Sequence, residues 1–186
     1  MAILGMLKDS PLHGYELRKR LAEVLGPMRP LSYGSLYPAL HRMSARGWLT
    51  EVELTPATET SAPPLSGRRA RVLYALTADG KQAFANWVNE AGPEAWDDEG
   101  FAAHLAFFSH TESRTRLRIL EGRRSRLEER MAHLRDSMTK SASRVDAYTL
   151  QLQQHGLDGV EREVRWLNEL IMQEHNNSVT TTTNSK

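Results

Sequence analysis

The chain has 186 residues, of which 40% are hydrophobic, enough to form one or two domains around a buried core. Its formal net charge of +1 excludes a polybasic nucleic-acid binder, so a DNA-binding surface would have to come from uneven placement of charge. There is no cysteine, which excludes disulfides and thiolate metal sites, and no apolar run near the ~20 residues of a membrane span, so we expect a soluble cytoplasmic protein.

Two short helices are predicted near the N-terminus. Residues 2–8 are apolar and end before Ser10-Pro11, which predicts a first helix. Residues 13–25 carry leucines and a valine at helical spacing, and this second helix stops at Gly26-Pro27. Bases outnumber acids within residues 1–50, which predicts a basic head on the more neutral or acidic remainder of the chain.

The third predicted helix, residues 32–47, has two different faces. Its apolar residues recur every three or four positions; they are Leu36, Ala39, Leu40 and Met43. Its other face carries small, hydrogen-bonding or cationic groups; they are Ser35, Tyr37, His41, Arg42 and Arg46. Such a helix suits insertion into a DNA major groove, and the alternative is a plain packed helix with a solvated face. We expect Ser32 to cap its start and Gly47 to end it in the left-handed conformation.

A β-hairpin is predicted after this helix. Residues 48–54 and 70–76 alternate between apolar and polar, and a turn-rich loop at residues 55–68 joins them. Such a hairpin would form a wing beside the third helix. From this wing, Arg68 and Arg69 would reach DNA phosphates or the minor groove. The alternative is that these arginines protect a sheet edge from aggregation.

A domain boundary is predicted at Gly92-Pro93. Residues 77–90 form a fourth helix capped by Thr77, so the first domain is residues 1–92. The second domain, residues 97–175, is predicted to be helical throughout. Its helices cover residues 101–109, 112–140 and 144–175, and the last of them contains Gly156 and Gly159, which leave open whether it is continuous. Residues 176–186 have little to bury and are expected to be a disordered tail.

Apolar stripes run along the last two helices. The first is formed by Leu117, Leu120, Leu127, Met131, Leu134 and Met138, and the second by Val145, Tyr148, Leu152, Val160, Val164, Leu167 and Ile171. Because long amphipathic helices rarely satisfy such stripes alone, we expect them to pack on a second copy of the chain; packing within one chain is the alternative. The predicted fold class is mainly α: an α+β winged helix-turn-helix with a two-stranded wing, then an all-α helical or coiled-coil dimerisation domain.

Four motifs resemble the PadR family of bacterial transcriptional regulators in order and spacing. They are HGYEL at 13–17, SYGSLYPALHRM at 32–43, RGWLT at 46–50 and RVLYALTADGK at 71–81. Residues 97–174 are similar to the virulence-activator-type, AphA-like helical domain, mainly in GVEREVRWLNELI at 159–171. The resemblance implies a winged-helix domain bound to double-stranded operator DNA, a homodimer built through C-terminal helices, and repression that small phenolic or drug-like molecules relieve in some members.

The resemblance also implies positions that contact DNA. Tyr15 matches a tyrosine near the phosphate backbone, and Arg68 and Arg69 match the basic wing. The residues that match the recognition-helix segment are Ser32, Tyr33, Ser35, Tyr37 and Arg42. One departure is the loop at residues 55–66, which is longer and richer in proline than the family's usual short turn.

Aromatic residues flank the predicted boundary. They are Trp87, Trp96, Phe101, Phe108 and Trp166. Aromatic faces bind flat apolar ligands well, so one hypothesis is a pocket for a small aromatic effector, and the alternative is core packing.

No enzyme site is predicted. The seven histidines lack metal-binding spacing, the glycines form no phosphate-binding loop, and the serines lack a nucleophile context. We therefore expect no catalytic activity, metal, cofactor or membrane partner. Two functions from different classes remain: a homodimeric repressor that binds a palindromic operator, and a winged-helix protein–protein adaptor whose basic face is incidental.

Overall fold

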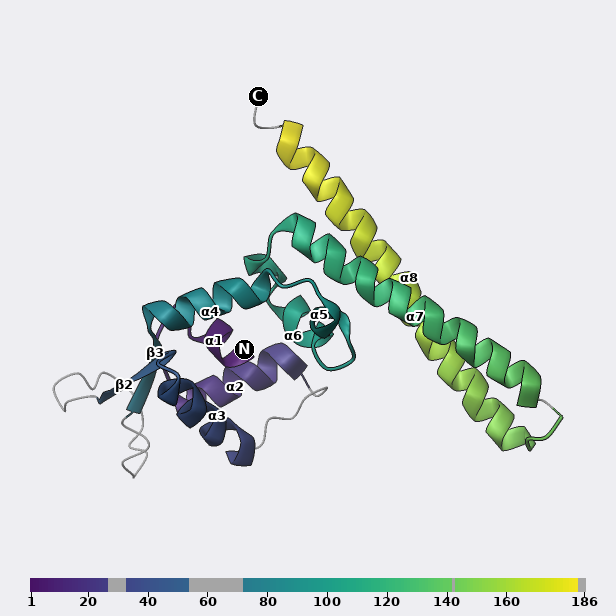
Figure 1. Cartoon of the computed structure of the whole chain (residues 1–186), viewed down its shortest axis with the longest axis horizontal. Helices are drawn as coiled ribbons and strands as arrows, with labels where there is room; N and C mark the ends of the chain where they lie inside the picture. The colour runs from purple at the N-terminus through teal and green to yellow at the C-terminus, as the bar shows by residue number, and fades with distance from the viewer. Residues whose placement is uncertain (27–32, 54–71, 142, 184–186) are drawn as a thin grey trace. The chain divides into compact units, whose positions relative to one another are not determined.

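The computed structural model describes residues 1–26, 33–53, 72–141 and 143–183, which are drawn in colour in Figure 1. The chain divides into two compact units. The first contains Met1–Asn89 and Leu105–His110, and the second contains Glu90–His104 and Thr111–Lys186. This division differs from the predicted one, because a short segment from within the predicted second domain belongs to the first unit.

Within the described residues, the first unit combines four α-helices and a short 3₁₀-helix at Phe108–His110 with a small antiparallel sheet. Its helices are α1 (Ala2–Met6), α2 (Gly14–Leu25), α3 (Tyr33–Ala45) and α4 (Ala78–Val88), and its strands are β1 (Leu12–His13), β2 (Leu49–Glu53) and β3 (Val72–Leu76). The strand order is β1-β3-β2, with Leu12 opposite Tyr74 and Leu49 opposite Leu76. The predicted helix-turn-helix and two-stranded hairpin are confirmed, and β1 is a third strand that we did not predict.

Leucines from three helices form the core of the first unit. The fully buried ones are Leu4, Leu17, Leu21, Leu36 and Leu40. The predicted apolar faces of α2 and α3 therefore do face the core, except that Val24 of the predicted stripe of α2 is 45% exposed. Phe107, from the segment Leu105–His110, also lies in this core and contacts Phe84 edge-on, with ring centres 5.5 Å apart.

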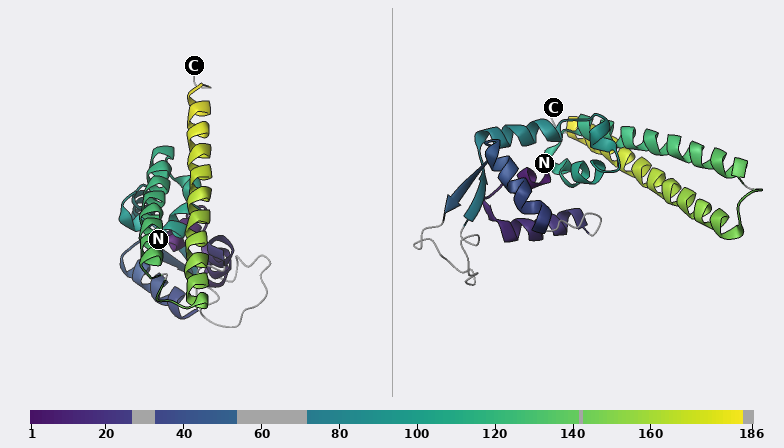
Figure 2. Two further views of the ribbon diagram at one scale, coloured as in Figure 1. Left: turned by 90° about the vertical axis from the view of Figure 1, so that its right-hand side faces the viewer. Right: turned by 60° about the horizontal axis from the view of Figure 1, so that its bottom comes forward.

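The second unit is built on a helical hairpin. Its helices are α5 (Pro93–Trp96), most of α6 (Phe101–Ala106), α7 (Ser113–Ser141) and α8 (Ala147–Thr183). α7 and α8 pack along each other in opposite directions, as both views of Figure 2 show. α8 passes through Gly156 and Gly159 without a break. The expectation of a disordered tail from residue 176 is wrong as far as Thr183, because α8 continues to that residue; residues 184–186 lie outside the described part.

The buried stripe of α8 differs from the predicted one at its N-terminal end. Leu157, Val160, Leu167 and Ile171 are buried, whereas Tyr148 and Leu152 are 86% and 71% exposed. Gln153, which is half buried, takes the inward position one turn before Leu157. The apolar stripe therefore turns away from α7 near the tip of the hairpin and leaves two large apolar side chains in solvent.

Arg123 of α7 joins three segments of the second unit. Its guanidinium donates hydrogen bonds to the carboxylates of Asp98 and Glu163, and its carbon lies 5.3 Å from the ring centre of Phe101. The side chain is buried, so both carboxylates are needed to compensate the loss of hydration. The same contact holds the pKa of Asp98 below its ordinary value, mainly through the hydrogen bond from Arg123.

Within the described ranges, no helix is both long enough and apolar enough to span a membrane.

Candidate nucleic-acid interface

The outward face of α3 is the first part of the candidate interface. Leu36 and Leu40 are completely buried and fix the orientation of the helix. The opposite face is exposed and consists of Ser35, Pro38, His41, Arg42 and Ala45. Small side chains near the start of this face and cationic ones further along allow the helix to approach the edges of bases closely.

Tyr37 lies between α3 and α2 and does not belong to this exposed face. The side chain is half buried, and a carbon added at Gly14 would lie 3.1 Å from its hydroxyl oxygen. The ring is thus packed against the start of α2. A side-chain carbon at position 14 would require the ring of Tyr37 to shift by a few tenths of an ångström, so glycine at this position allows the close contact.

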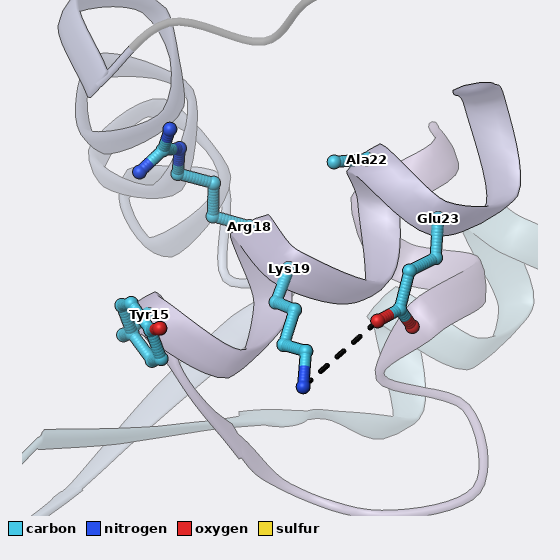
Figure 3. Close-up of a pocket in the computed structure, with 5 residues that line it drawn as sticks. All are labelled: Tyr15, Arg18, Lys19, Ala22 and Glu23. Atoms are coloured by element: carbon cyan, nitrogen blue, oxygen red, sulfur yellow. Dashed lines mark ion pairs between the residues drawn. The ribbon is translucent and has the colours of Figure 1, made fainter. Parts of the chain in front are cut away.

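The exposed side of α2 forms the second part of the candidate interface. Tyr15 is 53% exposed there, and it lies one turn before Lys19, as Figure 3 shows. These side chains border a shallow pocket, whose lining residues are Tyr15, Arg18, Lys19, Ala22 and Glu23. The ammonium of Lys19 lies 4.0 Å from the carboxylate of Glu23, and both side chains are mostly exposed, so this ion pair contributes little to stability.

His13 connects the start of α2 to the strand that follows the predicted wing. Its backbone N–H donates to the carboxylate of Glu16 at 3.4 Å, and its Nδ1 lies 3.2 Å from the carbonyl oxygen of Val72. Val72 is the first residue of β3. His13 was not among the predicted site residues, because its role depends on the pairing of β1 with β3, which the sequence does not indicate.

The end of α3 is fixed by a turn at Gly47, as predicted from the sequence. Gly47 has a φ of +73°, in the left-handed region where glycine is favoured, and the hydroxyl of Thr77 donates to its carbonyl oxygen at 2.6 Å. Thr77 also accepts a hydrogen bond from the N–H of Gly80, which confirms the predicted cap of α4. Arg46 lies over the ring of Trp48, 5.1 Å from its centre.

Several predicted DNA-contacting residues fall outside the described part of the chain. These are Ser32, Arg68 and Arg69. Tyr33 is the first residue of α3, and its side chain is likewise not described. The structure brings Ser35 and Arg42 to the same exposed face and places Tyr15 on the neighbouring helix.

The five aromatic residues suggested for an effector pocket belong to separate units. In the first unit, Trp87 packs with Phe84 and Phe107, each with ring centres 6.0 Å apart, and Phe108 follows Phe107. In the second unit, Phe101 and Trp166 meet edge-on at 6.1 Å. Trp96 lies against Gly122, where an added carbon would be 2.6 Å from its indole nitrogen. Trp87, Trp96, Phe101 and Trp166 therefore take part in packing, each within its own unit.

Comparison with known proteins decides the class of the first unit. Residues 3–86 match the family described as the transcriptional regulator PadR-like family. The chain contains a PadR-like domain. The domain carries both parts of the candidate interface, α2 and α3, and the resemblance predicted from the four motifs is confirmed. The family description is of regulators and not of enzymes, in agreement with the expectation from the sequence.

Relatives of this PadR-like domain include the negative transcriptional regulator PadR of Bacillus subtilis strain 168, which is 28% identical over 100 residues. The match covers 53% of this chain and 50% of that protein, so the chain spans about half the length of the relative. The crystal structure of Bacillus subtilis PadR in complex with operator DNA is 21% identical, with a TM-score of 0.40, over 93% of this chain and 97% of that one. The virulence activator AphA of Vibrio cholerae is 17% identical, with a TM-score of 0.38, over 94% and 96%.

Proposed function

We propose that this chain is a sequence-specific, DNA-binding transcriptional regulator that inserts α3 into the major groove. The observation that carries the proposal is the outward face of α3, polar and cationic, on a helix whose other face is locked into the core of a PadR-like domain. The arrangement supports the assignment because a recognition helix needs a rigid support and an exposed face with hydrogen-bonding groups. The alternative of a protein–protein adaptor has no comparable support.

Most of the predicted contact residues have a proposed role. Ser35 and Arg42 read base edges, and exposed His41 is added to them because it lies on the same face. Tyr15 and Lys19 on α2 contact phosphates, as do Arg68 and Arg69 from the predicted wing. We assign Tyr37 a positioning role, because its ring packs against Gly14 and holds α3 on α2.

The regulator is proposed to act as a homodimer on a palindromic operator in the cytoplasm. The support is the large apolar side chains that α8 leaves exposed within one chain, of which Tyr148, Leu152 and Met172 are the most exposed. A second copy would cover them, and two heads related by a two-fold axis would read two half-sites. Repression is the proposed direction, because the relative from Bacillus subtilis is named as a negative regulator.

Release of the operator by a small aromatic effector is a further part of the proposal. It is supported by the family resemblance, and the five aromatic residues suggested for the pocket occur in both units, so they do not form one pocket within either. Titration with a panel of phenolic compounds, followed by tryptophan fluorescence and operator release, tests it. Absence of any response across the panel would contradict it.

Salt-dependent DNA binding tests the proposed function. The full chain is titrated into fluorescent duplexes taken from beside its own coding region, at several salt concentrations. We expect tight binding whose affinity falls by roughly 0.9 log units per log unit of salt for every phosphate contacted. An adaptor would show neither specific binding nor this slope.

A further inference from the structure

His13 joins three elements of the first unit at one point. It is the last residue of β1 and immediately precedes α2, and its side chain reaches β3. The next residue, Gly14, lies against the ring of Tyr37 on α3. Two adjacent residues therefore connect the start of α2 to β3 on one side and to α3 on the other.

The backbone pairing between β1 and β3 is short. It consists of Leu12 opposite Tyr74 and His13 opposite Leu73, whereas β2 pairs with β3 along its whole length. The imidazole of His13 adds a link one residue further along β3, because its Nδ1 lies 3.2 Å from the carbonyl oxygen of Val72. With so few backbone pairs, this side-chain hydrogen bond is a substantial part of the attachment of β3 to the start of α2.

The chemistry of this contact fixes the position of the proton on the imidazole. A carbonyl oxygen can only accept a hydrogen bond, so Nδ1 of His13 donates and must carry a proton. In the neutral ring, Nε2 is then left without a proton. The contact is partly buried, which strengthens the hydrogen bond relative to one in water. The structure therefore requires one particular tautomer of His13, and this requirement can be measured.

We propose that His13 is a positioning residue for binding the DNA backbone, an inference that rests on the proposed function. Its Nδ1–H holds β3, the strand that follows the predicted wing, against the start of α2. Tyr15, two residues further along, is 53% exposed and has a proposed phosphate contact. With β3 fixed, phosphate contacts from α2 and from the wing form together and with less loss of conformational freedom on binding. His13 acts through these two elements and makes no contact with DNA itself.

The tautomer of His13 is the first test, and it uses the wild-type full chain without DNA. ¹H–¹⁵N NMR of the imidazole nitrogens, at a pH at which the ring is neutral, shows which nitrogen carries the proton. We expect the proton on Nδ1. A proton on Nε2 alone would leave Nδ1 unable to donate to Val72 and would overturn the proposal.

Two matched variants separate the contact with Val72 from the start of α2. Asparagine and serine both suit the position before a helix, but only the amide of asparagine offers an N–H donor at about the place of Nδ1, because the serine side chain is one bond shorter. Fluorescence anisotropy with the operator and with a scrambled duplex, at several salt concentrations, measures the binding of each full-chain variant. We expect His13→Ser to weaken binding to both duplexes alike, by about fivefold, and to flatten the salt dependence. His13→Asn should bind within about twofold of the wild type.

Three results would overturn the positioning role. They are wild-type affinity in His13→Ser, an equal loss in both variants, and a loss confined to the operator, which would indicate base reading. Urea unfolding of both variants shows that they are folded. The wild type in the same titrations reports on the proposed function: if it binds DNA and His13→Ser matches it, the positioning role alone is rejected, and if it binds neither duplex, both are rejected.

Discussion

Gly5 of α1 lies directly against the ring of Phe107, and a side-chain carbon at position 5 would overlap Cε1 and Cζ of that ring. The two residues are far apart in the sequence. Phe107 comes after α6, yet it is buried in the core of the first unit, beside Phe84 and Trp87. The PadR-like domain therefore depends for its core on a residue beyond the matched segment 3–86.

Gly5→Ala should destabilise the first unit by about 1–3 kcal/mol, because the added methyl forces the ring of Phe107 out of a packed position. Urea unfolding of the full chain measures this change. Gly156→Ala is the matched control: nothing lies within 4 Å of a carbon added there, so it should stabilise α8 by about 0.5–1 kcal/mol. A Gly5→Ala variant as stable as the wild type would show that the ring does not fill this space.

The buried imidazole of His104 predicts a loss of stability in weak acid. Burial lowers the pKa of His104 to about 4, so the side chain is neutral in the folded protein at pH 7. In the unfolded chain its pKa is about 6.5. The unfolded state therefore binds the extra proton first, and stability falls as the pH drops from about 6.5 to 4, by up to about 3 kcal/mol.

Urea unfolding at pH 7 and at pH 4.5 checks this prediction, because it gives the loss in the free energy of unfolding between the two pH values. The His104→Gln variant should lose less stability over this interval than the wild type. His133→Gln, which removes an exposed histidine of α7, should behave as the wild type does. An identical pH dependence of the wild type and His104→Gln would contradict the prediction.

Arg42→Ala should weaken binding to the preferred operator by roughly 1–3 kcal/mol while leaving binding to unrelated DNA nearly unchanged, because base contacts carry specificity. Fluorescence anisotropy with the operator and with a scrambled duplex measures both. Lys140→Ala is the control, since this exposed lysine at the end of α7 pairs with Asp136. An equal loss of affinity for both duplexes would contradict this prediction and show that Arg42 contacts phosphates and not bases.

Arg68→Ala should weaken binding to all duplexes alike and flatten the salt dependence by about 0.9 log units per log unit of salt, since one phosphate contact is lost. The same anisotropy titrations, repeated at several salt concentrations, give the slope. Unchanged affinity at every salt concentration would rule out the predicted role of the wing.

Leu152→Glu should convert a dimer into monomers, because it places a charge among the exposed apolar residues of α8. Sedimentation equilibrium at micromolar concentration measures the mass. Gln151→Glu changes the adjacent exposed position by the same charge and should leave the dimer intact. If both variants and the wild type had the mass of one chain, the proposed homodimer would not exist.

Periodicity predicted those elements that bury one face. α2 and α3 were identified because Leu17, Leu21, Leu36 and Leu40 recur at helical spacing, and all four are buried. Gly47 and Thr77 were identified by local turn and cap chemistry, which does not depend on distant residues. The family resemblance added the expected contact residues, and Ser35, Arg42 and Tyr15 do lie exposed.

Features that depend on distant partners could not be predicted. β1 contains only Leu12 and His13, and it is a strand because β3 lies beside it. The sequence pattern places Tyr37 on the outward face of its helix, because the contact with Gly14 of another helix forms only in the fold. The burial of Arg123 could not be predicted, because the carboxylates that compensate its charge, Asp98 and Glu163, come from other segments.

Selection of bound duplexes from a random DNA pool by the full chain, followed by sequencing, tests the central claim most directly. If α3 of a paired PadR-like domain reads the major groove, the selected pool will converge on two inverted half-sites at a fixed spacing of about one helical turn or a multiple of it, and Arg42→Ala will relax the preference at particular positions. A pool that remains random after several rounds, at low salt and with folded protein, would contradict the account.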